Sequence, residues 1–511
     1  MMEVFFMLFS SISPNAVLRN LSAITVSNIF LQILGFLYRI LLSRMAGAEG
    51  MGVYQLIMPL YSLLMSISLS GIAISVSRLC AERFSLGDFS ACRRLRTLAI
   101  KIFSFLVLIL AVVFLLFPHF FCESFLGDVR LLPTLPLLFI CLFLTGIENI
   151  TKSYFYGIGR VFPQITSELS EQAVRAVAVF SLLSYFPLRS AGFSSFLILC
   201  GMIISELSSV FILALFYRFI KLPKNKLSKR APKSREIISS AAPISLSHSA
   251  NNLLSALCSV IIPRGLRASG HTVLSATESF GVMFGMTLPL LNFSIAFIAS
   301  LTSVMMPRLA NAMARGDISD VRRKAAKTIH STSLLAIPFL ALSAALGKPL
   351  GFMFFGDFRA GELILPLAVS TLISYYEMAF GAILTSIGEQ KKSAVYIILG
   401  GIILLIFCFF VSIPGVGLLA FAIGSIVSGL FTASLQFMLI VRKLSLSPRI
   451  SNWFLTPLFC GALCFFVAKL MYGVFASLIL SAGLSLIFYL LSLYVFGTNP
   501  VRYIKTLIRE E

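Results

Sequence analysis

Charged side chains within or at the ends of long apolar runs are the residues of this sequence best suited to chemistry. A charge near the centre of a bilayer costs about 2.5 to 3.5 kcal/mol on insertion scales, so such a side chain usually faces a protein interior or a water-filled cavity. Arginines there can bind an anionic substrate, and carboxylates can couple transport to a cation or form structural ion pairs. The candidates are Arg39, Arg175 and Arg264 for substrate binding, and Glu171, Glu206 and Glu377 for coupling or ion pairing.

One apolar run, residues 163–186, carries several polar residues on one helical face. Glu171 and Arg175 have the favourable i, i+4 order and can neutralise each other, so a structural ion pair and a substrate site are both open. Glu206, in the middle of the next apolar run, can pair with Arg175 or titrate as a coupling carboxylate. Helical spacing places on that face Glu168, Glu171, Gln172 and Arg175.

The remaining candidates have weaker local signals. Arg39 lies in the outer half of its run, where it can face a cavity or extend to the outer interface beside Arg44. Arg264 follows its run on the outer side, as an interfacial anchor does, but it also matches Arg44 in an internal repeat. Glu377 lies mid-run without a partner nearby in sequence, so a transport role and a structural role both stay open.

Signals for enzymatic chemistry are nearly absent from the sequence. The four histidines have no metal-ligand spacing, no Ser-His-Asp set is apparent, and no G-x-x-x-x-G-K-[ST] phosphate loop occurs. The nine cysteines lie mostly in apolar runs, which indicates buried thiols. We therefore expect no catalytic residue, no cofactor and no metal. A membrane-embedded glycosyltransferase, the alternative class, normally has large loops with paired carboxylates, whereas the outer loops expected here are all short.

Apolar helices must position these side chains. The 511 residues are 58% hydrophobic and only 12% charged, which is too apolar for one soluble core and indicates an all-α polytopic membrane protein. Runs long enough to cross about 30 Å of hydrocarbon predict fourteen transmembrane helices. Their expected ranges are 21–43, 54–77, 98–118, 132–151, 163–186, 193–217, 238–262, 281–305, 327–347, 363–386, 393–413, 416–441, 452–472 and 474–496.

Basic residues predict the orientation of these helices. With the N-terminus inside, 31 Lys and Arg lie in cytoplasmic segments and 8 in outer loops. Because positive loops resist translocation, this bias predicts that both termini are cytoplasmic. The net charge of +21 comes from short segments between apolar runs, which favours contact with anionic lipid headgroups and not with nucleic acid.

Landmarks that recur at a nearly constant offset predict an internal duplication. Pro59 is matched by Pro289, and Gly87-Asp88 is matched by Gly316-Asp317. Since an even number of helices preserves orientation, two six-helix lobes should be related by an axis along the membrane normal. The expected domains are an N-lobe, a basic cytoplasmic linker, a C-lobe, and a final helix pair with a short tail: 1–220, 221–236, 237–442 and 443–511. The linker has a second interpretation as a site for lipid headgroups or a partner.

Several segments resemble the polysaccharide-transport branch of the multidrug, oligosaccharidyl-lipid and polysaccharide (MOP) exporter superfamily, and most of all the stage V sporulation protein B group. These segments are GFLYRILLSRMAGAEGMGVYQLIMPLYSL at 35–63, SGIAISVSRLCAER at 70–83, GMTLPLLN at 285–292, SVMMPRLANA at 303–312 and, more weakly, SIGEQKKSAVY at 386–396.

The resemblance implies a multi-pass flippase of the bacterial plasma membrane that moves an undecaprenyl-pyrophosphate-linked saccharide outward through a central cavity. Arg39 matches a cavity arginine of related lipid II flippases. Those flippases also carry cations on their second and eighth helices. The corresponding ranges here, 54–77 and 281–307, contain no charged residue, so the identity of the transported saccharide stays open. The expected partners are a lipid-linked anionic saccharide and membrane lipids, and we expect a monomer. The rival within the superfamily is a cation-coupled multidrug exporter.

Overall fold

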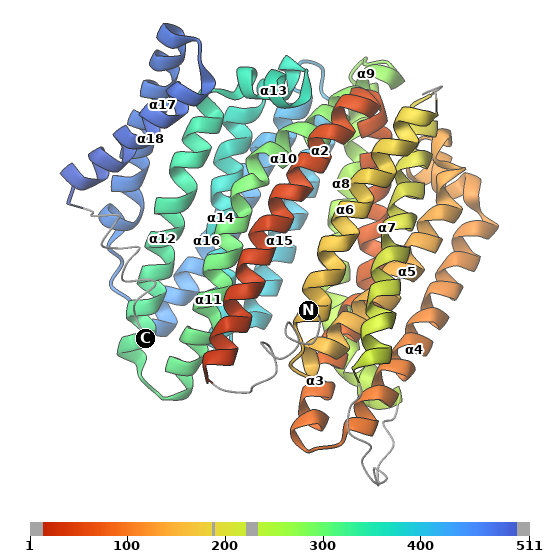
Figure 1. The fold of residues 1–511 in the computed structure, drawn as a ribbon. Helices are drawn as coiled ribbons and strands as arrows, with labels where there is room; N and C mark the ends of the chain where they lie inside the picture. Colours follow the sequence, from red (N-terminus) through yellow and green to blue (C-terminus); the bar gives the residue numbers. More distant parts are fainter. Residues whose placement is uncertain (1–13, 187–189, 221–233, 498–511) are drawn as a thin grey trace, which may run out of the picture. The chain divides into compact units, whose positions relative to one another are not determined.

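The computed structural model describes residues 14–186, 190–220 and 234–497, and in these ranges every regular element is helical (Figure 1). The prediction of an all-α protein is therefore confirmed. The chain divides into two compact units, Met1–Val260 and Ile261–Glu511. The predicted linker 221–236 lies outside the described residues except for its last three, which begin a helix.

Unit 1 contains a long first helix, α2, that joins the first two expected spans. Gly47 interrupts α2 with a φ of 69°, a left-handed conformation that glycine adopts without a steric cost. The helix then continues through a π-helical turn, η1, into α3. The elements of unit 1 are α2 (Pro14–Met65), η1 (Ser66–Ser70), α3 (Gly71–Ser85), α4 (Phe89–Leu116), η2 (Phe120–Phe125), η3 (Val129–Leu131), α5 (Thr134–Gly157), α6 (Phe162–Tyr185), α7 (Ala191–Phe219) and most of α8 (Ser234–Ala268).

Unit 2 begins near the end of α8 and is built in a similar order. Its second expected span is one nearly continuous run, α9 to α11, which includes a π-helical turn. The elements are α9 (Val273–Gly281), η4 (Val282–Thr287), α10 (Leu288–Leu291), η5 (Asn292–Ser294), α11 (Ile295–Ala314), α12 (Ile318–Ala345), α13 (Gly347–Phe355), η6 (Phe358–Gly361), α14 (Ile364–Ser386), α15 (Gln390–Phe409), η7 (Phe410–Ser412), α16 (Leu418–Leu444), η8 (Ser451–Leu455), α17 (Thr456–Phe475) and α18 (Leu478–Val495).

Eleven helical stretches of the described residues are long and apolar enough to cross a membrane, which supports a multi-pass membrane protein. One of them, Phe30–Ser85, covers the second expected span completely and the first from residue 30 onward. The helices α6, which holds three charged residues, and α8, whose first half is rich in serine, are not among the eleven. The count of fourteen stays a prediction.

Two local motifs occur once in each unit, at the offset of the predicted repeat. Gly87 and Gly316 have φ values of 75° and 73°, and the aspartate after each one caps the following helix, α4 or α12. An ion-pair motif repeats in the same way on the connections before α5 and α14. Arg130 contacts Asp128 and Glu49, and Arg359 contacts Asp357 and Glu278. Each of these pairs of motifs is what a duplicated six-helix unit would contain.

Candidate functional site

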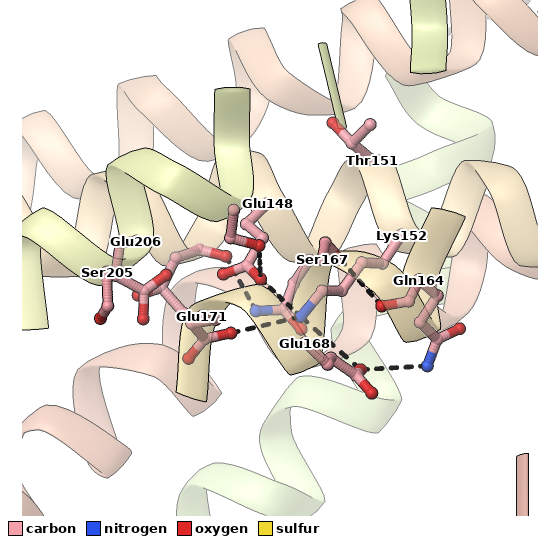
Figure 2. Close-up of polar contacts among 12 residues, drawn as sticks. Glu148, Thr151, Lys152, Gln164, Ser167, Glu168, Glu171, Ser205 and Glu206 are labelled. Atoms are coloured by element: carbon pink, nitrogen blue, oxygen red, sulfur yellow. Dashed lines mark hydrogen bonds and ion pairs between the residues drawn. The ribbon is translucent and has the colours of Figure 1, made fainter. Parts of the chain in front are cut away.

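Three helices of unit 1 bring six charged side chains together inside the protein. In unit 1, α6 packs along α7, and α5 packs along α7 as well (Figure 1). Figure 2 shows Lys152 among Glu148, Glu168 and Glu171, with Glu206 nearby. We call this group the α5–α7 charge cluster, and its members are Glu148 and Lys152 of α5, Glu168, Glu171 and Arg175 of α6, and Glu206 of α7.

Lys152 is the cation at one end of the cluster. Its Nζ lies 2.5 Å from Glu148 and 3.6 Å from both Glu168 and Glu171, while only 8% of the residue is exposed. The Ser209 hydroxyl donates a hydrogen bond to Glu148. The carboxylates of two helices therefore share one ammonium group.

Arg175 is the cation at the other end. Its Nη2 contacts Glu171 and lies 3.2 Å from Glu206, and its Nε donates to the Ser205 hydroxyl at 3.2 Å. The i, i+4 spacing on α6 allows the contact with Glu171, and α7 supplies Glu206. Two carboxylates and a hydroxyl therefore already engage Nε and Nη2 of this guanidinium.

The charges of the cluster do not balance. Four carboxylates face two cations, which leaves an excess of two negative charges if every group is ionised. Oxygens of Glu148, Glu171 and Glu206 lie within 4.8 Å of one another. Glu206 is 2% exposed, and its Oε2 has no hydrogen-bond partner in the described part of the chain. Because buried uncompensated charge is costly, this arrangement is suited to hold protons or a cation.

Glu148 and Lys152 are not among the site residues predicted from the sequence. Both belong to α5, whose apolar run was expected to end at residue 151. An i, i+4 pair of opposite charges in an otherwise apolar run was the available signal. The contacts of Glu148 and Lys152 with α6 and α7 depend on helix packing, which residue spacing in the sequence does not determine.

The other arginines lie outside the cluster. Arg39 is exposed on α2 and has no ion-pair or hydrogen-bond partner among the described residues. The adjacent Tyr38 is buried, and both Arg39 and Arg175 are close enough to act electrostatically on Tyr38 and Tyr54. Arg264, on α8, belongs to unit 2. The structure places Arg39 and Arg175 in unit 1, and the grouping of Arg39, Arg175 and Arg264 in one substrate site stays a prediction.

Glu377 lies in unit 2, on a polar seam between α14 and α16. It sits against Gly429 and Thr432 of α16. A little further along α16, Gln436 is fully buried and donates to Ser393 of α15 at 2.9 Å. Glu377 therefore has polar neighbours that its own helix did not reveal, and its role stays a prediction.

The family model for "Polysaccharide biosynthesis protein" matches residues 17–313, more than half of the chain. Two similar proteins come from Bacillus subtilis (strain 168). Stage V sporulation protein B is 22% identical over 441 residues, covering 84% of this chain and 85% of that protein. Lipid II flippase MurJ is 22% identical over 423 residues, covering 76% of each chain.

Solved structures with a similar fold are transporters. An inward-facing multidrug resistance MATE family transporter of the MOP superfamily has a TM-score of 0.66 at 15% identity, covering 82% of this chain and 98% of the other. A MOP superfamily transporter from Pyrococcus furiosus has a TM-score of 0.61 at 16% identity, covering 83% of this chain and 95% of the other. This multi-pass chain therefore has a MOP-type fold and belongs to the polysaccharide biosynthesis protein family.

Proposed function

We propose that this protein is a flippase that moves a polyprenyl-pyrophosphate-linked saccharide, a precursor of peptidoglycan or polysaccharide, from the inner to the outer leaflet by alternating access. The observation that carries the proposal is the family match over residues 17–313. Similarity to a lipid II flippase over 76% of the chain supports a lipid-linked saccharide as the substrate class. The MOP-type fold supports a transport mechanism.

The proposal includes the architecture expected from the sequence. Fourteen helices form two six-helix lobes, residues 1–220 and 237–442, followed by a helix pair within 443–511, and both termini are cytoplasmic. The motifs that recur in both units support this layout, since each unit carries its own copy of the capped turn and of the arginine ion pairs. The protein acts as a monomer in the plasma membrane of a bacterium.

Arg39 is the principal substrate-binding residue in this proposal. It is exposed and has no ion-pair partner among the described residues, so its guanidinium is available to a pyrophosphate. Arg175, in contrast, is engaged by Glu171 and Glu206. We assign Arg175 and Arg264 supporting roles in the attraction of the anionic headgroup.

A flipping assay tests this assignment. Protein in proteoliposomes with a labelled polyprenyl-pyrophosphate saccharide should move label to the opposite leaflet. Arg39→Ala should slow flipping about tenfold or more, because a hydrogen bond to a charged group contributes about 1.5 to 3 kcal/mol. Arg39→Lys should keep part of the rate, and Arg315→Ala, at an exposed position at the end of α11, should keep all of it. Full activity of Arg39→Ala would remove this residue from the site.

A cation-coupled exporter of the same superfamily is the second candidate. The observation in its favour is the α5–α7 charge cluster, with two carboxylates in excess and an unpaired oxygen on Glu206. Protonation or cation binding there would compensate the excess charge and would change the packing of α5, α6 and α7. Glu377 would be a second coupling carboxylate in unit 2.

Glu206→Gln separates the two candidates. The amide keeps the size of the side chain but cannot ionise. In an exporter, transport by Glu206→Gln should no longer depend on a proton or sodium gradient, whereas Glu389→Gln, beside two half-exposed lysines, should behave like the wild type. In a flippase that uses the membrane potential, the wild type already ignores these gradients.

A further inference from the structure

The exposed face of α4 changes from basic to apolar along its length. Arg94 and Lys101 are both exposed. They are about two helical turns apart, so their side chains lie on nearly the same face of α4. The same face then continues with large apolar side chains that the protein leaves uncovered. These are Phe105, Leu108, Val112 and Leu116, which are 64%, 61%, 49% and 68% exposed. Cations at one end and an apolar stripe beyond them match the chemistry of a phospholipid with an anionic headgroup.

The two cations of this face are not neutralised by the protein. Neither Arg94 nor Lys101 forms an ion pair with a carboxylate of the described residues. Asp88, the nearest acid before them in the chain, caps α4 and accepts hydrogen bonds from the Ala91 amide and the Ser90 hydroxyl, both at 3.1 Å. The face is therefore available to an external anion.

On the equivalent helix of unit 2, α12, the matching arginine already has a carboxylate partner. Arg323 matches Arg94 at the same offset that relates Gly316 to Gly87, and its guanidinium is 2.9 Å from Asp320. The position of Asp320 corresponds to Ala91 in α4, which supplies no charge. One unit thus pairs its arginine internally, and the other leaves the matching arginine unpaired.

The apolar part of the two helices differs in the same way. Ile337 of α12 is 4% exposed, because α17 and α18 cover it with Cys460, Cys464 and Tyr489. The matching residue of α4, Leu108, is 61% exposed. Within unit 2, the α17–α18 pair stands outside the predicted repeat and packs against α12. In a membrane, lipid must take its place on α4.

We propose that the α4 face is a binding site for an anionic phospholipid of the bilayer, such as phosphatidylglycerol. Arg94 and Lys101 bind the headgroup phosphate, and an acyl chain lies along Phe105, Leu108 and Val112. From Lys101 to Val112 the helix rises about 16 Å, which matches the depth of one hydrocarbon leaflet of about 15 Å. The site is independent of the transported substrate.

Tryptophan fluorescence can measure this binding, because the sequence has one tryptophan, Trp453. In a Trp453→Phe background, Phe105→Trp places the reporter on the α4 face. Ile487→Trp places a matched reporter on α18, where the residue is 56% exposed and the helix has no Lys or Arg. Quenching by brominated phosphatidylglycerol is compared with quenching by brominated phosphatidylcholine in mixed bilayers of the two lipids.

Phosphatidylglycerol should be preferred about fivefold or more at the α4 reporter, since a basic residue near an anionic headgroup contributes about a factor of five. At the α18 reporter the preference should be near one. Arg94→Gln with Lys101→Gln should remove the preference, while Arg323→Gln, with its internal partner, should leave it unchanged. Equal preference at both reporters, or an unchanged preference in the double variant, would overturn the proposal. Loss of the preference on addition of inorganic phosphate would show a site for free phosphate and would also overturn it.

Discussion

At the scale of single residues, the α5–α7 charge cluster has few cations for many carboxylates. Lys152 lies within ion-pair distance of three carboxylates, and Arg175 of two. Removal of one partner from a buried pair leaves the other charge uncompensated, which is more harmful than the absence of both. Each of the two cations should therefore matter for folding, whatever the transported substrate is.

Lys152→Met should lower the free energy of unfolding by about 3 to 5 kcal/mol, because Glu148 would lose its closest cation in a buried site. Denaturant unfolding of the purified protein in detergent micelles measures the change. Lys392→Met is the matched control, since Lys392 is half exposed beside Glu389 and such pairs contribute about 0 to 1 kcal/mol. Equal stability of the two variants would show that the cluster is already protonated enough to dispense with Lys152.

The ion pair between Arg359 and Asp357, on the connection before α14, predicts an acid response. Partial burial raises the pKa of Asp357, but hydrogen bonds from the Arg359 side chain and backbone together lower it by more. The pKa of Asp357 therefore lies below the ordinary value of 3.8. A lowered pKa contributes stability above pH 3.8 that is lost as the pH falls through the lowered value. Asp357→Asn should therefore reduce the pH dependence of the unfolding temperature below about pH 4 and leave the rest of the profile unchanged. An identical acid slope in the variant would exclude this contribution.

At the scale of elements, small residues set how closely the helices of unit 1 approach. Gly146 of α5 lies against the buried ring of Phe103 on α4, where an added Cβ would be 1.9 Å from the ring. Such a distance requires the ring or the helix to move. The α4–α5 contact thus depends on a glycine in the middle of a helix, despite the weak helix propensity of glycine.

Gly146→Ala should destabilise the protein by about 1 to 3 kcal/mol through overpacking. Gly35→Ala is the control, because a Cβ at Gly35 has no atom within 4 Å. Thermal unfolding followed by circular dichroism measures both variants. Addition of Phe103→Leu to Gly146→Ala should restore part of the loss, and a failure to restore any of it would locate the cost elsewhere than in this contact.

At the scale of the whole molecule, the proposed flippase has an energy source in the membrane potential. When the membrane potential is negative inside, outward movement of about two negative charges is favourable by about 2.3 kcal/mol per charge per 100 mV. This drive disappears if Arg39 and a second arginine move fully with the substrate. We therefore expect these arginines to stay almost fixed relative to the membrane field while the helices move around them.

An imposed inside-negative potential should accelerate outward flipping in proteoliposomes, and its dissipation should slow flipping without any sodium or proton gradient. Leakage of the vesicles is checked with a soluble dye. A rate that ignored the potential but followed a sodium or proton gradient would make Glu171, Glu206 and Glu377 the principal residues and would favour the cation-coupled exporter.

The sequence by itself determined the all-helical class, the membrane character and the family resemblance, and these expectations are confirmed. The reason is that local composition carries each of them. An apolar run long enough to span hydrocarbon has few alternatives to a helix, since its backbone groups must be paired internally. The i, i+4 spacing of Glu171 and Arg175 likewise places both on one face whatever surrounds them.

Only the tertiary structure decided which helix supplies the neighbours of each face. Lys152 was not among the candidates, yet it contacts Glu168 and Glu171 of another helix. Leu108 and Ile337 occupy matching positions in similar apolar helices, but Ile337 is buried under α17 and α18 of its own unit, whereas Leu108 is exposed. Helical periodicity assigns a residue to a face of its own helix, whereas the covering of that face depends on packing between segments that are distant in the chain.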